Sequence, residues 1–105
     1  MCEVKTLSQR GSTVISQCIE CKMLNIWHNN LLFNFTPQQF ADFCSFVGSL
    51  EFEDRSHPFP DGQERAILKT PVEHLNFTFT KDEWEDMKAA MDEATYMQTV
   101  FALIR

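Results

Sequence analysis

Two segments of the chain share one pattern of apolar and polar positions. The first, LLFNFTPQQFADF, begins at Leu31, and the second, LNFTFTKDEWEDM, begins at Leu75. In each segment apolar residues first recur at every second position, which is the period of a half-buried strand. After a threonine the spacing changes to that of an amphipathic helix. The pattern predicts a strand followed by a helix in both halves of the chain.

The threonines mark the expected helix starts. Thr36 precedes Pro37, which suits a first helical position because the N–H that proline lacks has no helical partner there. Thr80 opens the sequence Thr-Lys-Asp-Glu, which has the spacing of a capping box. We expect helices from Pro37 to about Leu50 and from Lys81 toward the C-terminus. The apolar stripes that they would bury are Phe40, Phe43, Cys44 and Val47, and then Trp84, Met87, Met91, Ala94 and Phe101.

A further apolar segment precedes each Phe-rich strand. Residues 23–27 precede a turn at 28–30, and residues 66–70 precede a turn at 71–73. Each half therefore predicts a β-hairpin followed by a helix. The first residues add another hairpin that turns around Arg10. The sequence thus predicts an α+β fold in which an antiparallel sheet of about six strands carries two helices on one face.

We interpret residues 1–105 as a single domain. Its expected parts are a Cys-bearing N-terminal hairpin, a first ββα unit, a long loop and a second ββα unit, and they correspond to residues 1–21, 22–50, 51–65 and 66–105. Two prolines and a glycine in the long loop argue against regular structure there.

Composition and charge narrow the classes of function. Hydrophobic residues make up 44% of the chain and include ten Phe, which is enough for one packed core. Residues 1–50 contain three basic and three acidic residues, whereas residues 51–105 contain six and twelve and carry the whole net charge of −6. The absence of a Lys/Arg cluster in the sequence argues against nucleic-acid binding. An acidic surface is compatible with a basic protein partner.

The sequence also bears on localisation. No apolar run approaches the roughly 20 residues that a membrane-spanning helix needs. The first residues lack the layout of a signal peptide. We therefore expect a cytoplasmic protein that does not enter the membrane. Cysteines in that compartment are usually reduced, so a cysteine pattern points to metal or redox chemistry more than to disulfides.

Three of the four cysteines are expected to meet at one end of the sheet. If the N-terminal hairpin turns around Arg10, facing residues have numbers that sum to about 20, and Cys2 lies opposite Cys18. Cys21 follows in Cys18-Ile19-Glu20-Cys21, which links the hairpin to the next strand. A Cys-x-x-Cys turn between two strands is the half-site of zinc ribbons. Cys2, Cys18 and Cys21 are therefore predicted zinc ligands.

A closed zinc site needs a fourth ligand. His74, in a turn, and His57, in the long loop, are the candidates. His28 is excluded, because an extended strand would place it about 20 Å from Cys21. Cys44 lies on the predicted apolar helix face and is expected to belong to the core.

Three functions remain open at this point. The first is a non-catalytic, zinc-stabilised module that binds another protein, and the lack of a recognisable catalytic motif favours it over an enzyme. The second is a thiol redox protein or sensor that uses Cys18 and Cys21, although redox Cys-x-x-Cys pairs usually open a helix. The third is a small-ligand binder with a pocket under loop 51–65, lined by Trp27, His57 and Phe59. The alternative to all three functions is that the cysteines and the loop have only structural roles.

The segments MCEVKTLS, QCIECKMLNI and LLFNFTPQQF resemble a family of small, uncharacterised bacterial proteins. Its members begin Met-Cys, carry Cys-x-x-Cys near residue 20 and continue into Phe-rich strand–helix units. The resemblance, to a domain of unknown function, implies no activity. It does imply that Cys2 belongs with Cys18 and Cys21.

Overall fold

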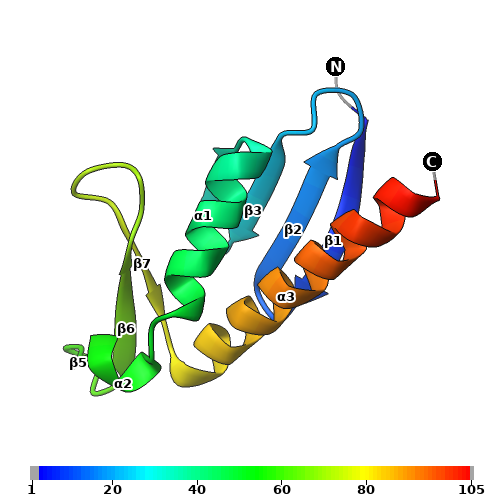
Figure 1. Cartoon of the computed structure of the whole chain (residues 1–105). Coiled ribbons are helices and arrows are strands. Elements are labelled where there is room, and N and C mark those ends of the chain that lie inside the picture. The colour runs from blue at the N-terminus through cyan, green and yellow to red at the C-terminus, as the bar shows by residue number, and fades with distance from the viewer. Residues whose placement is uncertain (1–2, 105) are drawn as a thin grey trace.

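A computed structural model of the chain describes residues 3–104 and contains two antiparallel sheets (Figure 1). Neighbouring strands in the four-stranded sheet are consecutive in sequence, in the order β1 (Val4–Arg10), β2 (Thr13–Cys18), β3 (Leu24–His28) and β4 (Leu31–Phe35). The three-stranded sheet has the order β5 (Ser56–Pro58), β6 (Glu64–Lys69) and β7 (Asn76–Phe79).

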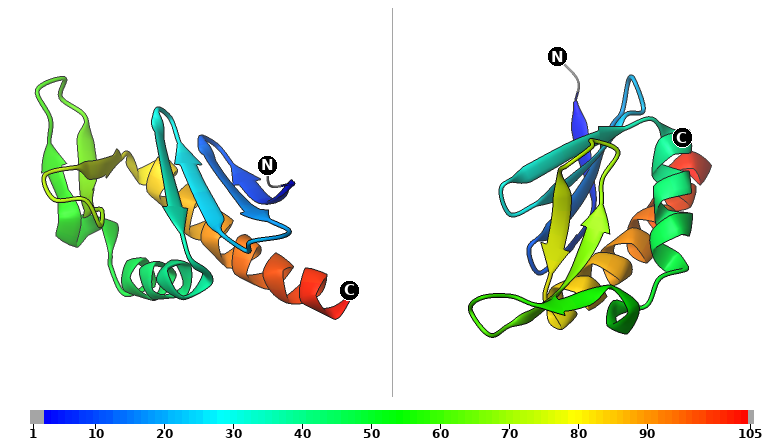
Figure 2. Two further views of the ribbon diagram at one scale, coloured as in Figure 1. Left: turned by 90° about the horizontal axis from the view of Figure 1, so that it is seen from above. Right: turned by 90° about the vertical axis from the view of Figure 1, so that its left-hand side faces the viewer.

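Three helices complete the part of the chain that the structure describes. They are α1 (Pro37–Gly48), α2 (Phe52–Arg55) and α3 (Lys81–Leu103). Helices α1 and α3 lie on the same face of the four-stranded sheet (Figure 2). The three-stranded sheet lies beside that sheet, at the end where α3 begins (Figure 1). Within residues 3–104, no helix combines the length and the apolar character needed to cross a membrane.

The α+β class and the antiparallel pairing are confirmed, but the single sheet of about six strands with two helices is wrong. The described residues form seven strands in two sheets, together with three helices. The strands of the second ββα unit pair with β5, which the sequence places in a loop, and not with β4. The predicted loop 51–65 instead contains α2 and β5. Pro58 is tolerated at the end of β5 because β5 is an edge strand.

Both helix starts are capped as the sequence predicts. The Gln39 N–H donates to Thr36 Oγ1 at 3.1 Å, and the Thr36 N–H donates to Gln39 Oε1 at 3.0 Å. At α3 the Glu83 N–H donates to Thr80 Oγ1 at 3.2 Å, and the Thr80 N–H donates to Glu83 Oε1 at 2.9 Å. Each pair is a full capping box, which satisfies N–H groups that the helix itself cannot.

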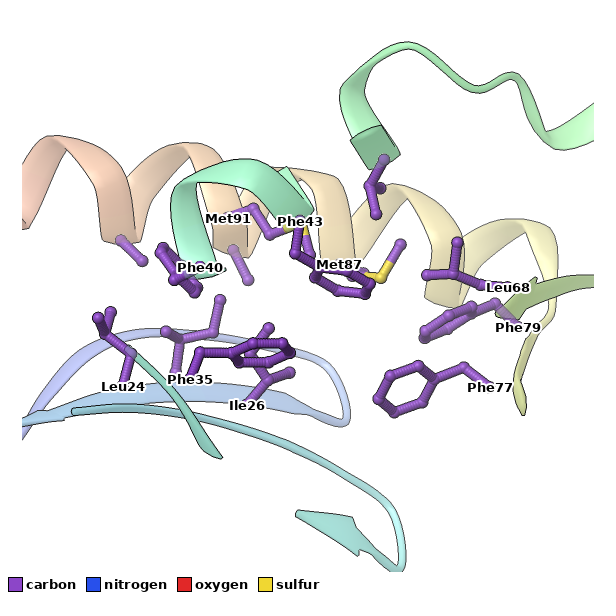
Figure 3. Close-up of a cluster of buried hydrophobic side chains, with 14 of the residues drawn as sticks. Leu24, Ile26, Phe35, Phe40, Phe43, Leu68, Phe77, Phe79, Met87 and Met91 are labelled. Carbon is purple, nitrogen blue, oxygen red and sulfur yellow. The ribbon is translucent and has the colours of Figure 1, made fainter. Parts of the chain in front are cut away.

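The core lies between the helices and the two sheets (Figure 3). Helix α1 buries Phe40, Phe43 and Val47, and α3 buries Trp84, Met87, Ala90, Met91 and Ala94. Cys44 is half-buried and packs against the same cluster, as expected. The predicted stripes are therefore core, except that Phe101, near the end of α3, is only half-buried.

A bulge in β1 sets the register of the N-terminal hairpin. The pairing shifts by one residue between Thr6 and Ser8, so that Leu7 and Ser8 are both buried although they are adjacent in a strand. The Ser8 hydroxyl donates to the Ala90 carbonyl of α3 at 2.7 Å. The bulge thus turns one apolar and one polar side chain toward α3.

Aromatic side chains join the two sheets. The His28 ring of β3 lies 4.6 Å from the Phe79 ring of β7, and the Phe33 ring of β4 lies 5.0 Å from the Phe77 ring, in each case between centroids. His28 is buried, and its Nδ1 lies 3.1 Å from Thr13 Oγ1. Burial lowers the pKa of His28, and the negative charge of Glu83 opposes that shift. His28 is therefore neutral in the folded protein at neutral pH.

We expect His28 to make the fold less stable in mild acid. Because its pKa is lowered on folding, the unfolded chain binds a proton first as pH falls through about 6.5, and stability falls by at most about 1.4 kcal/mol per pH unit until the folded His28 also titrates. His28→Gln removes the titratable imidazole and keeps a polar side chain that can hydrogen-bond to Thr13. Urea denaturation from about pH 7.5 to about pH 5.5 should show a steeper loss in the wild type than in the variant. Parallel curves would contradict this.

Phe79 should be essential to the junction between the sheets. Its ring contacts His28 and also lies 6.0 Å from the Trp84 ring of α3. Phe79→Ala should lower the free energy of unfolding by about 3–5 kcal/mol, because a large buried ring leaves a cavity. The control is Leu32→Ala, at a side chain 62% exposed, which should change stability by less than about 0.5 kcal/mol. If urea denaturation showed the same loss of unfolding free energy in Phe79→Ala and Leu32→Ala, Phe79 would not be essential to the junction.

Candidate functional site

The connection between β2 and β3 forms a tight turn around two cysteines, which we call the knuckle (residues 18–23). The Lys22 N–H donates to the Cys18 carbonyl at 3.0 Å, and the Cys18 N–H donates to the Met23 carbonyl at 2.9 Å. Lys22 has a φ of 68°, which reverses the chain. Inside the turn, the Cys21 N–H donates to Cys18 Sγ at 3.4 Å. The knuckle thus directs a backbone donor at one of its own sulfurs.

Glu3, the first described residue, is hydrogen-bonded to the knuckle through both its N–H and its carbonyl. The Ile19 N–H donates to the Glu3 carbonyl at 2.8 Å, and the Glu3 N–H donates to Glu20 Oε1 at 2.8 Å. The same Glu20 oxygen lies 3.8 Å from Cys18 Sγ. Glu3 is therefore held in place against the knuckle even though its side chain is exposed.

The hairpin register differs from the one we expected. Val4, not Cys2, is opposite Cys18, because the chain turns after Arg10, between the paired residues Arg10 and Thr13. The β1 bulge moves the partner of Cys18 from Lys5 to Val4, which is one residue closer to the expected position. Cys2 itself lies outside the described residues, so the predicted three-thiol cluster stays a prediction. Within residues 3–104, no group of three or more His, Cys, Asp or Glu side chains is arranged to hold a metal ion.

The two knuckle cysteines differ in exposure. Cys18 is 3% exposed, whereas Cys21 is exposed to solvent. Cys18 is the last residue of β2, and Cys21 lies in the turn that follows. Cys21 is therefore the sulfur that reagents and ions in solution reach first.

Both histidines proposed as a fourth ligand belong to the other sheet. His57 is exposed in β5. His74, in the turn between β6 and β7, has a side chain 89% exposed, and its Nε2 lies 3.4 Å from Glu73 Oε1. The knuckle connects strands of the four-stranded sheet, close to the N-terminal end of the described chain (Figure 1). The described structure does not bring either histidine to the knuckle.

The three residues proposed for a ligand pocket are likewise not brought together. Trp27 is on β3, is 53% exposed, and donates from Nε1 to the Asn29 carbonyl at 2.8 Å. His57 and Phe59 are at the three-stranded sheet, where the guanidinium carbon of Arg65 lies 5.3 Å from the centre of the Phe59 ring. These contacts describe two separate surface sites, not one pocket.

A groove of about 640 Å³ lies beside the knuckle instead. Strands β1 and β2, the knuckle and the last turns of α3 line it, and Cys18 and Lys22 are among the lining residues. Sequence reasoning missed this groove because it forms where residue 5 meets residue 101. The one sequence signal was that the apolar stripe of the second helix extends to Phe101, which packs against the core but is only partly buried.

A family model matches residues 1–104 of the chain. The chain belongs to DUF6686, a family of unknown function. This match confirms the expectation of an uncharacterised family. No curated protein and no solved structure matches the chain. The chemistry of this DUF6686 protein therefore has to be argued from its own residues.

Cys44 differs chemically from the knuckle cysteines. It lies on α1 and packs against the core. Burial and the nearby charge of Asp92 raise the pKa of the Cys44 thiol to about 11, and a hydrogen bond with Thr95 opposes the shift. Cys44 is therefore protonated at neutral pH and unsuited to bind a metal or attack a disulfide.

Cys44 should resist alkylation in the folded protein. At about pH 8 a thiol whose pKa is about 11 holds roughly 100-fold less thiolate than a free thiol, so its reaction with iodoacetamide should be slower by about that factor. Peptide mass spectrometry after timed alkylation measures this rate for each cysteine. In urea, Cys44 should react at the rate of an ordinary peptide thiol, which serves as the control. A fast reaction in the folded state would contradict the buried, protonated thiol.

Proposed function

We propose that this DUF6686 protein is a non-catalytic zinc-binding module in which Cys18 and Cys21 are two of the ligands. The observation that carries the proposal is the Cys21 N–H, which donates to Cys18 Sγ within a turn between two antiparallel strands. A backbone donor stabilises a thiolate, which is the form that binds zinc. The proposal treats the knuckle as a preformed half-site.

Cys2 is the proposed third ligand. Glu3 is bound to the knuckle through both its N–H and its carbonyl. Cys2 directly precedes Glu3 in the sequence, so the two hydrogen bonds that tie Glu3 to the knuckle support the choice of Cys2 as a ligand. The anchoring of Glu3 supports this choice even though Val4, and not Cys2, is paired with Cys18.

Glu20 is a better candidate for the fourth ligand than His57 or His74. A tetrahedral ion with Zn–S near 2.3 Å and Zn–O near 2.1 Å places the sulfur and oxygen about 3.6 Å apart. The separation of Glu20 Oε1 and Cys18 Sγ is 3.8 Å. The carboxylate thus needs only a small movement to share an ion with that sulfur.

The surroundings of the pair favour a metal site over a redox site. A redox Cys-x-x-Cys pair usually stands at a helix N-terminus, which lowers the pKa of its thiol. Here the pair ends β2 and precedes β3, with no described helix next to it in sequence. The role of the ion would then be to fix the N-terminal hairpin to the rest of the sheet. The acidic second half of the chain would remain available for a basic protein partner.

The zinc content of the purified chain tests the proposal. Native mass spectrometry in the presence of a reductant should show about one zinc ion per chain. Cys2→Ser, Cys18→Ser and Cys21→Ser should each lose it, and Glu20→Gln should weaken binding more than the exposed control Glu85→Gln. The matched control Cys44→Ser changes a cysteine outside the knuckle and should keep the ion.

The same experiment separates the alternatives. Less than about a tenth of an equivalent of zinc would reject the metal site. If the zinc-free protein also showed a depressed thiol pKa at Cys18 or Cys21, a redox role would replace it. Zinc retained by all three cysteine variants would show that the ion binds elsewhere on the chain.

A further inference from the structure

The groove beside the knuckle has the size and lining of a small-molecule site. Its volume is about 640 Å³, within the range of roughly 300–1,000 Å³ that is usual for ligand pockets. Apolar side chains cover much of it, including Leu7, Ile19, Phe101 and Ile104. Ile104 is 71% exposed.

The charge of the groove is opposite to that of the protein. Lys5 and Lys22 line it, and none of the described lining residues is acidic, although the chain has 15 acidic residues. Glu20 lies near the groove, with its Oε1 3.8 Å from Sγ of the lining residue Cys18. The Lys5 Nζ lies 4.0 Å from the centre of the Phe101 ring. A cation is therefore held directly against the apolar wall, where it can meet an anion that also carries an apolar tail.

We propose that this groove binds a small amphipathic carboxylate. The carboxylate pairs with Lys5 and Lys22, and the apolar tail lies over Ile19, Phe101 and Ile104. The amides of Gln17 and Gln98, which also line the groove, can donate further hydrogen bonds. The proposal goes beyond the zinc site and does not need an ion, because every group that it uses is present in the chain itself.

The two lysines have a competing explanation. Among the described residues, the last turn of α3 contains no basic side chain, and a cation near a helix C-terminus commonly offsets the helix dipole. Lys5, which contacts Phe101, could serve that purpose alone. On this explanation the lysines contribute to stability and not to ligand binding, so the two roles are separable by experiment.

Isothermal titration of the full chain with sodium decanoate tests the proposal. Decanol, which has the same tail without the charge, is the ligand control. Lys5→Gln and Lys22→Gln should each weaken decanoate binding by about five-fold, the effect of losing one exposed charge contact. The control Lys69→Gln removes the same charge from the exposed surface of β6 and should leave the affinity unchanged. Zinc content is measured on the same samples, so that a failure of the zinc site is seen separately.

The titration has clear outcomes. Saturable decanoate binding that is tighter than decanol binding and falls in both lysine variants supports the carboxylate site. Equal binding of decanoate and decanol overturns it, because the groove would then be only apolar. Lysine variants that lower the melting temperature but leave decanoate affinity unchanged also overturn it, and they assign the lysines to the end of α3. An absence of decanoate binding overturns it outright.

Discussion

The packing of α3 against both sheets is the constraint on which the fold depends. In the described chain the two sheets share no hydrogen-bonded strand pair, so main-chain bonding does not hold them together. One helix of 23 residues contacts β6 and β7 with its first turns and β1 and β2 with its later ones. Its small buried residues, Ala90 and Ala94, let the helix approach the sheet closely. Gly11 faces the same helix: a side chain there would require the Asp86 carboxylate to move, and the φ of 55° at this position favours glycine.

The junction between the sheets is aromatic and contains one polar group. His28 contacts Phe79 and Phe77 while it keeps a hydrogen-bonding partner in Thr13. A buried imidazole without such a partner would cost free energy, so Thr13 makes the histidine tolerable in the core. Phe33 and Phe77 occupy equivalent positions in the two segments with similar sequence patterns, and their ring centroids are 5.0 Å apart. The two segments therefore contact each other at the junction between the sheets.

Local features of this fold could be predicted from sequence, and non-local ones could not. Thr36 and Thr80 cap their helices because capping depends on residues three positions apart. The division into two sheets depends on which strands pair, and apolar alternation is the same for a strand in either sheet. The β1 bulge was not predicted, and it turns Ser8 toward the Ala90 carbonyl, which is 82 residues away in the sequence and so outside any local pattern. Pro58 and Gly62 suggested a loop since proline counts against a central strand, but β5 is an edge strand.

The candidate site also has a local part, the knuckle, and a non-local part, the groove. The knuckle could be predicted because Cys18 and Cys21 are three residues apart, whereas the groove requires the end of α3 to lie against β1. Cys18, Lys5 and Lys22 all line that groove. A zinc ion held by three thiolates and a carboxylate would carry a net charge of about −2, which two nearby lysines would offset. A carboxylate in the groove would compete for the same lysines. If both proposed sites exist, zinc and an anionic ligand would share one set of positive charges, and occupancy of either site would oppose occupancy of the other.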